Sequence, residues 1–179
     1  MTDHGPPGAG WPAPGIIRTP RLVLEPLSEA HAEPAAAAFD DPALHSFTGG
    51  LPATVAELRG RYVLQSVGHS PDNREGWLNW MVRRRTATAE LVGTVQATLR
   101  RGNGGLTAEL AWVVASAAQG AGIATESSAA VAGWLRGRGV GRFTANIDPG
   151  HHASMAVARH LGMSPTAGVV DGETVWASV

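Results

Sequence analysis

The sequence predicts one α/β domain built on a mixed, mostly antiparallel sheet. Three consecutive segments alternate apolar and polar residues with a period of two, which is typical of half-buried strands. These segments are residues 77–82, 91–99 and 107–115. The pattern then changes to helix, strand and helix, over residues 120–136, 142–147 and 153–161. A strand that follows a helical crossover pairs in parallel with the strand before it, so the predicted sheet contains both strand directions.

The segment before these strands predicts a first strand and a first helix. Residues 21–25 form the strand, and Pro26 ends it because proline cannot donate a ladder hydrogen bond. Ser28 is a suitable N-cap for a helix that continues to Phe39. Pro34 lies inside that helix, so we expect the helix to be kinked or to start late.

A second helix is predicted from Thr54 to about Val67. Thr54 and Glu57 have the spacing of a capping box, in which each residue satisfies a backbone N–H near the other. The apolar positions of this helix recur every three to four residues. They are Val55, Leu58, Tyr62 and Val63.

Glycine-rich turns separate the later elements. Residues 102–105 (GNGG) join two strands of the meander as a hairpin. Asp171 and Gly172 form the turn of a last hairpin between residues 169–170 and 174–179. An edge of this terminal hairpin is a possible pairing surface for a homodimer.

Composition favours a protein without a membrane span. The chain has 179 residues, no cysteine and a net charge of −1. Disulfides, thiol catalysis and cysteine-ligated metals are therefore excluded, and neither nucleic acid nor an anionic membrane is an expected partner. No apolar run reaches about 18 residues and the N-terminus lacks a signal-peptide pattern, so we expect a cytoplasmic protein.

Two compositional features divide and classify the chain. Residues 1–15 are rich in proline and glycine and are predicted to be a flexible tail, with the folded domain over residues 16–179. All 14 cationic residues are arginine, which is typical of a GC-rich bacterial genome. The absence of lysine excludes Schiff-base chemistry and the lysine-containing phosphate loop.

The segment from Gln119 to Thr125 carries the strongest chemical signal. It joins a strand to a helix and contains Gly120 and Gly122, which allow the backbone to approach a ligand closely. The first amides of a helix have no intrahelical partner, so they favour an anion such as a pyrophosphate. The glycines alone are equally consistent with a plain strand-to-helix turn. The segment lacks the third glycine of the dinucleotide-binding fingerprint.

The spacing Gln119-x-x-Gly122-x-Ala124 resembles the Gln/Arg-x-x-Gly-x-Gly/Ala signature of the GCN5-related N-acetyltransferase (GNAT) family. Further segments resemble the ribosomal-protein-alanine acetyltransferase-like (RimJ/RimL-like) branch, in the family's order. They are residues 19–24, 90–95, 147–154 and 158–163. Together the matches extend over residues 16–179.

The resemblance implies a GNAT fold with a β-α-β-α cofactor-binding core and helices on both faces of the sheet. Two parallel strands should splay apart so that the pantetheine arm of acetyl-CoA lies between them. The implied acetyl-CoA-binding residues are Val113, Val114, Ala115, Gln119, Gly120, Ala121, Gly122, Ile123, Ala124, Thr125, His151 and Ser154. No metal is expected, because His151, His152 and His160 have no accompanying carboxylate pattern.

The resemblance also implies acetyl transfer to a primary amine by direct attack in a ternary complex. Glu109 is the expected general base, with an exposed strand carboxylate as the alternative. Ser154 is expected to reach the thioester sulfur, although its position also suits helix capping. The family usually has Asn in place of His151 and often a Tyr on the last helix, whereas the only Tyr here is Tyr62.

The acceptor is predicted only as a protein N-terminus or a small amine or amino acid, bound between the early helices and the sheet. Candidate acceptor residues are Glu25, His45, Trp77 and Trp80. Trp residues are more often part of a core. A second function stays open, a catalytically weakened fold that binds acyl-CoA as a sensor or interaction module. His151 and the missing late Tyr are its support.

Overall fold

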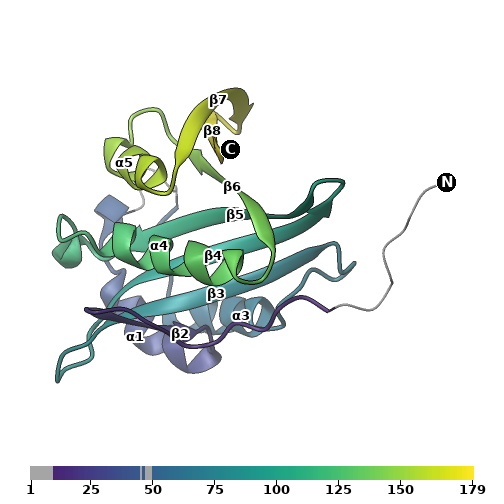
Figure 1. Ribbon diagram of the computed structural model, residues 1–179. Helices are drawn as coiled ribbons and strands as arrows, with labels where there is room; N and C mark the ends of the chain where they lie inside the picture. Colours follow the sequence, from purple (N-terminus) through teal and green to yellow (C-terminus); the bar gives the residue numbers. More distant parts are fainter. Residues whose placement is uncertain (1–9, 45, 47–49) are drawn as a thin grey trace.

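The computed structural model describes residues 10–44, 46 and 50–179. Its described strands form one eight-stranded sheet in the order β1-β2-β3-β4-β5-β6-β8-β7 (Figure 1). The strands are β1 (Ile17–Arg18), β2 (Leu22–Pro26), β3 (Glu75–Arg84), β4 (Leu91–Gly102), β5 (Gly105–Val114), β6 (Val140–Ile147), β7 (Met163–Val170) and β8 (Glu173–Ser178). Only β5 and β6 pair in parallel within this sheet, so the mixed, mostly antiparallel architecture is confirmed.

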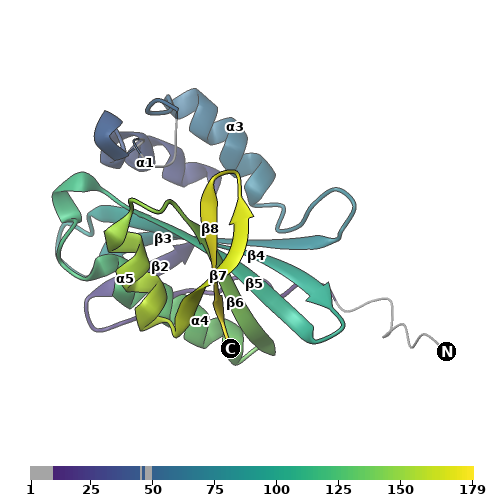
Figure 2. The same cartoon turned by 90° about the horizontal axis from the view of Figure 1, so that it is seen from above.

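Helices cover both faces of the sheet (Figure 2). The α-helices of the described chain are α1 (Ala32–Ala38), α3 (Val55–Gln65), α4 (Ile123–Arg136) and α5 (His152–His160). Three short 3₁₀ helices, η1 (Glu29–His31), η2 (Pro42–Leu44) and η3 (Ser116–Ala118), accompany them. The first two α-helices lie on one face, and α4 lies on the other, beside α5. This arrangement confirms the predicted fold.

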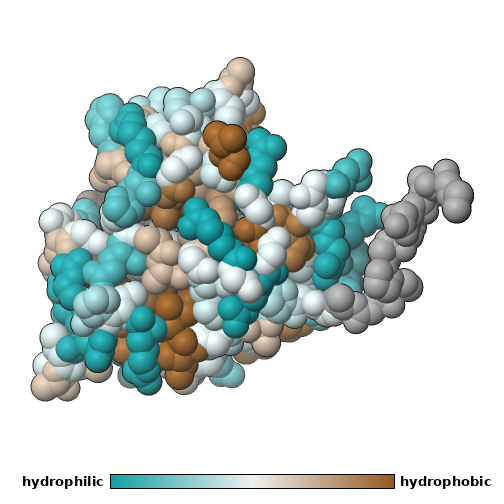
Figure 3. Space-filling view, viewed as in Figure 1, coloured by the Kyte–Doolittle hydropathy of each residue, from teal (hydrophilic) through white to brown (hydrophobic). Residues whose placement is uncertain are grey.

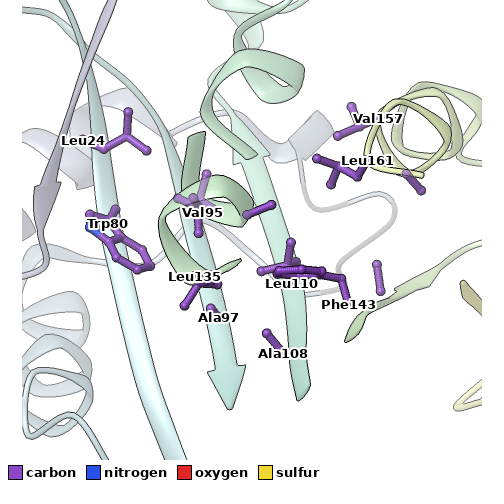
Figure 4. Close-up of a cluster of buried hydrophobic side chains, with 14 of the residues drawn as sticks. Leu24, Trp80, Val95, Ala97, Ala108, Leu110, Leu135, Phe143, Val157 and Leu161 are labelled. Atoms are coloured by element: carbon purple, nitrogen blue, oxygen red, sulfur yellow. The ribbon is translucent and has the colours of Figure 1, made fainter. Parts of the chain in front are cut away.

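Side-chain alternation along the strands divides the core into two clusters. Trp80 of β3 is completely buried among Leu24, Val95 and Leu135 on the α4 face (Figure 4). Its neighbour Met81 points to the opposite face, where it packs with the α1 and α3 cluster. Successive residues of a strand point to opposite faces, so adjacent side chains of β3 belong to different layers.

The helix α1 starts late, and one residue of α3 lies off the buried face predicted for it. Ser28 precedes a 3₁₀ turn, and α1 starts only at Ala32, which places Pro34 in the first helical turn. A proline there displaces no intrahelical hydrogen bond, so the late start is confirmed. The sequence pattern places Val63 on the apolar face of α3, but Val63 is 48% exposed in the structure. Leu58 and Tyr62 are one turn apart and define the buried stripe, which Val63 misses.

Folded contacts begin before Ile16. The indole of Trp11 donates to the Asn73 side chain at 2.9 Å and lies under the Arg101 guanidinium. The Gly15 carbonyl accepts a hydrogen bond from the Trp80 indole at 2.9 Å. Part of the segment predicted as a tail is thus held by aromatic contacts, whereas residues 1–9 lie outside the described chain.

On the face of the molecule that Figure 1 views, hydrophobic patches lie among hydrophilic residues (Figure 3).

Candidate functional site

The parallel strands β5 and β6 separate halfway along their length. Their pairing runs from Leu106 and Val140 to Glu109 and Thr144. Beyond that point β6 pairs with β8 through residues 144–147. Within the described chain, residues 110–114 of β5 therefore keep a strand neighbour only on the β4 side. Their backbone edge opens toward α5, as the splayed-strand prediction required.

The loop after β5 is built for a close approach of a ligand. Gly120 and Gly122 both have φ of +74°, in the left-handed region that favours glycine. Gly122 is the N-cap of α4, so the amides of Ile123, Ala124 and Thr125 form the unpaired first turn. Gln119 donates through Nε2 to the Val114 carbonyl at 3.1 Å, which ties the loop to the end of β5.

A cavity of about 460 Å³ occupies the gap between the separated strands and the start of α4. Most of the predicted acetyl-CoA residues line it. They are Val113, Val114, Gln119, Gly120, Gly122, Ile123, Ala124, Thr125, His151 and Ser154. Ala115 and Ala121 are not among its lining residues. The Ala115 amide instead donates to the Val92 carbonyl, and the Ala121 carbonyl accepts from Arg21.

Sequence reasoning missed several residues of this first cavity because they are small or apolar and carry no motif. They are Ala43, Leu44, Trp112, Ala118, Ala153, Ala156 and Val157. Trp112 is the most informative of them, because its indole N–H donates to Ser154 Oγ at 3.2 Å. An indole nitrogen can only donate, so Ser154 accepts in this pair and its own hydroxyl proton can point elsewhere.

His151 caps the helix that carries Ser154. The Ser154 amide donates to His151 Nδ1 at 3.3 Å at the start of α5. The cap role that the sequence left open for Ser154 therefore belongs to His151. Both side chains also face the first cavity, so capping does not remove either of them from the site.

An ion pair between a half-exposed Arg21 and a largely covered Glu126 lies beside the glycine loop. Arg21 Nε and Nη2 each lie 2.6 Å from Glu126 Oε2, and Arg21 Nη1 donates to the Ala121 carbonyl at 2.9 Å. Thr19 Oγ1 donates to Glu126 Oε1 at 2.5 Å. Burial alone would raise the pKa of Glu126, but the hydrogen bonds from Thr19 and Arg21 outweigh it and lower the pKa below 4.5. The matched segment 19–24 contains Thr19 and Arg21, and Glu126 directly follows the glycine segment, but the sequence did not indicate their contact.

Glu109 lies apart from the first cavity. Its Oε2 accepts from Arg100 Nη1 at 3.0 Å, and the same guanidinium contacts Glu75 at 2.8 Å. Glu109 shares a strand face with Val113, but four residues separate them, about 13 Å along a strand. Direct contact between this carboxylate and a group at Val113 is therefore excluded in this conformation.

A second cavity of about 360 Å³ lies between the sheet and the helices α1 and α3. Leu44 and Val113 line both cavities, so the two spaces adjoin at the end of β5. The remaining lining residues come from six segments of the chain. They are Leu27, Ala35, Ala36, Phe39, Gly50, Leu51, Ala53, Leu58, Arg61, Tyr62, Gln65, Met81, Thr94 and Gln96.

Of the predicted acceptor residues, Glu25, Trp77 and Trp80 line neither of these two cavities. Trp80 is buried on the opposite face of the sheet, and Trp77 donates to Glu75 Oε2 at 3.2 Å. Glu25 lies between His31 and Arg83, at 3.0 and 2.9 Å. Burial alone would raise the pKa of Glu25. The hydrogen bonds from His31 and Arg83 have a larger combined effect in the opposite direction, so the pKa lies below 4.5. His45 lies outside the described residues.

The described residues contain neither a cluster of metal-binding side chains nor a helix that could span a membrane. No group of three or more His, Cys, Asp or Glu side chains there is arranged to hold a metal ion. None of the helices in that part of the chain is long and apolar enough to span a bilayer.

Comparison with known proteins gives the family. The family model described as an acetyltransferase (GNAT) domain matches residues 21–164. RimL, a ribosomal L7/L12 α-N-protein acetyltransferase solved with coenzyme A, aligns with a TM-score of 0.72 and 19% identity over 92% of this chain and 98% of that one. A GNAT-family acetyltransferase from Bordetella pertussis aligns with a TM-score of 0.71 and 25% identity over 93% and 100%. A GNAT acetyltransferase from Bacillus anthracis has the same TM-score at 18% identity, over 92% and 98%.

No curated protein sequence matches the chain. Because the family model covers most of the sequence and the fold and loop agree with it, the chain belongs to the GNAT family of acetyltransferases.

Proposed function

We propose that this protein transfers an acetyl group from acetyl-CoA to a primary amine by direct attack in a ternary complex. The observation that carries the proposal is the pair of cavities that adjoin at Leu44 and Val113. One cavity begins at a glycine loop and a helix N-terminus, and the other lies against the early helices. Two substrates in these spaces would meet at the end of β5.

The first cavity fits coenzyme A by the chemistry of its donors. The first-turn amides of α4 suit a pyrophosphate, and a charge near a helix end gains about 0.3–1 kcal/mol from the helix dipole, up to about 2 when partly buried. The unpaired backbone edge at residues 110–114 suits the amides of a pantetheine arm. When bound, acetyl-CoA supplies the acetyl group as a thioester.

The acceptor amine must be neutral to attack. A lysine-like amine with a pKa of about 10.4 is neutral in roughly one molecule in a few thousand at pH 7, and an α-amine near 7.8 in about one in seven. Glu109 remains our candidate base. Its separation from Val113 requires that the proton reach it through water, and Arg100 holds the carboxylate in place at 3.0 Å.

Ser154 is the candidate proton donor to the departing thiolate. It lines the first cavity, and the Trp112 indole fixes its oxygen as an acceptor, which leaves the hydroxyl proton to be donated. His151 supports this serine indirectly by capping the first turn of α5.

Calorimetric titration with acetyl-CoA tests the first step. Gly122→Glu places a carboxylate at the helix N-terminus and strains a left-handed position, so we expect at least a hundredfold weaker binding than the wild type. Gly139→Glu is the matched control, because Gly139 has φ of +86° but does not line the first cavity. Absence of binding by a folded wild type would overturn the proposal. Binding without turnover of any amine would instead favour the acyl-CoA sensor.

A further inference from the structure

We propose that the acceptor is a free, apolar α-amino acid, that is, a primary amine whose carbon skeleton is apolar and carries a carboxylate. The inference rests on the proposed function, because it assigns the acceptor to the second cavity, here called the acceptor cavity. It goes further by choosing one chemical class among primary amines.

The wall of the acceptor cavity is mainly apolar. Side chains from the segment after β2, from α1 and its C-cap, from the segment before α3, from α3 and from β3 supply it. They are Leu27, Ala35, Ala36, Phe39, Leu51, Ala53, Leu58 and Met81. Such a wall contributes by removing an apolar side chain from water, so it favours an acceptor with an apolar skeleton. The polar side chains of the lining are Arg61, Tyr62, Gln65, Thr94 and Gln96.

Arg61 is the one charged residue among the described residues that line this cavity. Arg61 is exposed and makes no ion pair within 4.0 Å in the described part of the chain. Glu57, one helical turn earlier, has its pKa lowered mainly by Thr54 and more weakly by Arg61, but it does not line the cavity. Residues 45 and 47–49, which follow Leu44 in the sequence, include no acidic residue. A planar guanidinium matches a carboxylate bidentately, so this cation selects an acceptor that brings a negative group.

The geometry of α3 places a hydrogen-bond acceptor beside that cation. Leu58, Arg61, Tyr62 and Gln65 recur at the spacing of one helix face, and the buried Leu58 and Tyr62 hold this face against the sheet. Gln65 follows Arg61 by four residues, which separates their Cβ atoms by about 5–6 Å. The carboxylate and amine of an α-amino acid are attached to one carbon and can reach both side chains.

Gln65 supplies the independent observation. Its Oε1 is buried and has no hydrogen-bond partner among the described residues, although the side chain lines the acceptor cavity. A buried carbonyl without a donor is destabilising, so turning this amide toward an N–H of a ligand in the cavity gains binding free energy. The acceptor amine carries such hydrogens.

Other primary amines fit this cavity less well. A polyamine or a lysine side chain adds positive charge beside Arg61, and the described lining offers no carboxylate to neutralise it. A protein N-terminus has a peptide bond where the amino acid has its carboxylate, so it gives the guanidinium no carboxylate to bind bidentately.

The experiment compares matched amines with the full-length enzyme and saturating acetyl-CoA. Coenzyme A release is followed with a thiol-reactive dye, and the protein gives no background because it contains no cysteine. The substrates are leucine, phenylalanine, their C-terminal amides, spermidine and an Ala-initiated tripeptide amide. We expect kcat/KM for each amino acid to exceed that of its amide by at least tenfold. The amides are weaker bases with more neutral amine at pH 7, so intrinsic reactivity acts in the opposite direction.

Variants of Arg61 test whether the acceptor cavity causes the preference for amino acids over their amides. Arg61→Gln should raise the KM for leucine about tenfold to a hundredfold, bring the acid-to-amide ratio near one, and leave the KM for acetyl-CoA unchanged. Arg59→Gln is the matched control, because Arg59 lies on the same helix, pairs with Glu29 at 3.8 Å and does not line the cavity. Arg61→Lys should restore part of the preference.

The outcomes separate the two proposals. Turnover of spermidine, the tripeptide or the amides in preference to the amino acids would overturn the acceptor assignment and leave acetyl transfer standing. An unchanged acid-to-amide ratio in a folded Arg61→Gln would also overturn it. Acetyl-CoA binding with no turnover of any amine would overturn both.

Discussion

Arg21 and Glu126 contact the loop of residues 119–125, which we propose binds the pyrophosphate and here call the phosphate loop, on the side away from the first cavity. Glu126 is a carboxylate in the first turn of α4, where it suits the helix dipole but repels a pyrophosphate at the same helix end. Arg21 neutralises it and also holds the Ala121 carbonyl at 2.9 Å, between the two left-handed glycines. The pair thus fixes the backbone of the loop at Ala121. It also cancels the negative charge of Glu126 near the helix N-terminus.

Arg21→Gln should therefore weaken acetyl-CoA binding about tenfold, a coupling of about 1–2 kcal/mol, measured by calorimetry. Adding Glu126→Gln removes the uncompensated carboxylate and should recover much of that loss. Arg18→Gln is the control, since Arg18 lies on β1 and does not line the first cavity. Equal binding by Arg21→Gln and wild type would show that the pair only supports the fold.

Glu126 also contributes to the pH dependence of stability. Its folded pKa lies below 4.5, so its stabilising contribution is present above pH 4.5 and is lost as the pH falls through the folded value. Urea unfolding should show Glu126→Gln less stable than wild type at pH 7, with the difference shrinking below pH 4.5. A difference that stays constant down to low pH would contradict this linkage.

At the scale of elements, α3 forms one wall of the acceptor cavity and depends on its first turn. The capping box predicted from Thr54 and Glu57 is confirmed, with the Glu57 amide donating to Thr54 Oγ1 at 3.3 Å and the Thr54 amide donating to Glu57 Oε2 at 2.8 Å. The same cap lowers the Glu57 pKa, through the backbone hydrogen bond from Thr54 above all.

Thr54→Ala should lower the free energy of unfolding by about 1 kcal/mol, as measured by urea denaturation, because loss of the hydroxyl leaves the Glu57 amide unsatisfied. Thr54→Ser keeps the hydroxyl and should restore most of the stability. If Thr54→Ala is as stable as the wild type, the cap does not stabilise α3.

At the scale of the whole molecule, the two faces of the sheet have different tasks. One face packs α4 against the sheet, and the Trp80 and Trp134 rings meet edge to face with centroids 5.4 Å apart. The other face forms the acceptor cavity with α1 and α3. Trp80 therefore supports the layer that positions the phosphate loop, although it touches neither cavity.

Trp80→Ala should destabilise the entire domain by about 3–5 kcal/mol, seen as one cooperative unfolding transition at lower denaturant. Trp80→Phe keeps a large apolar ring, so it should fold and retain the wild-type KM for both substrates. A changed acceptor KM in a stable Trp80→Phe would instead support the acceptor role first considered for this residue.

Sequence by itself determined the features that depend on neighbouring residues. The capping box, the hairpin at residues 102–105 and the glycine loop before α4 are local, because backbone geometry and orphan amides are set within a few positions. The alternating segments predicted the antiparallel strands, and the helix, strand and helix pattern after them predicted the parallel pair of the mixed sheet. The resemblance in the loop then identified most residues of the first cavity.

Tertiary structure alone decided the features made by distant segments. Arg21 meets Glu126 across 105 positions, and the acceptor cavity combines residues from Leu27 to Val113. Strand register placed Trp80 on the face opposite that cavity and left Glu109 about 13 Å along the strand from Val113. Composition and spacing do not encode such relations directly, because register and helix docking result from packing the whole core.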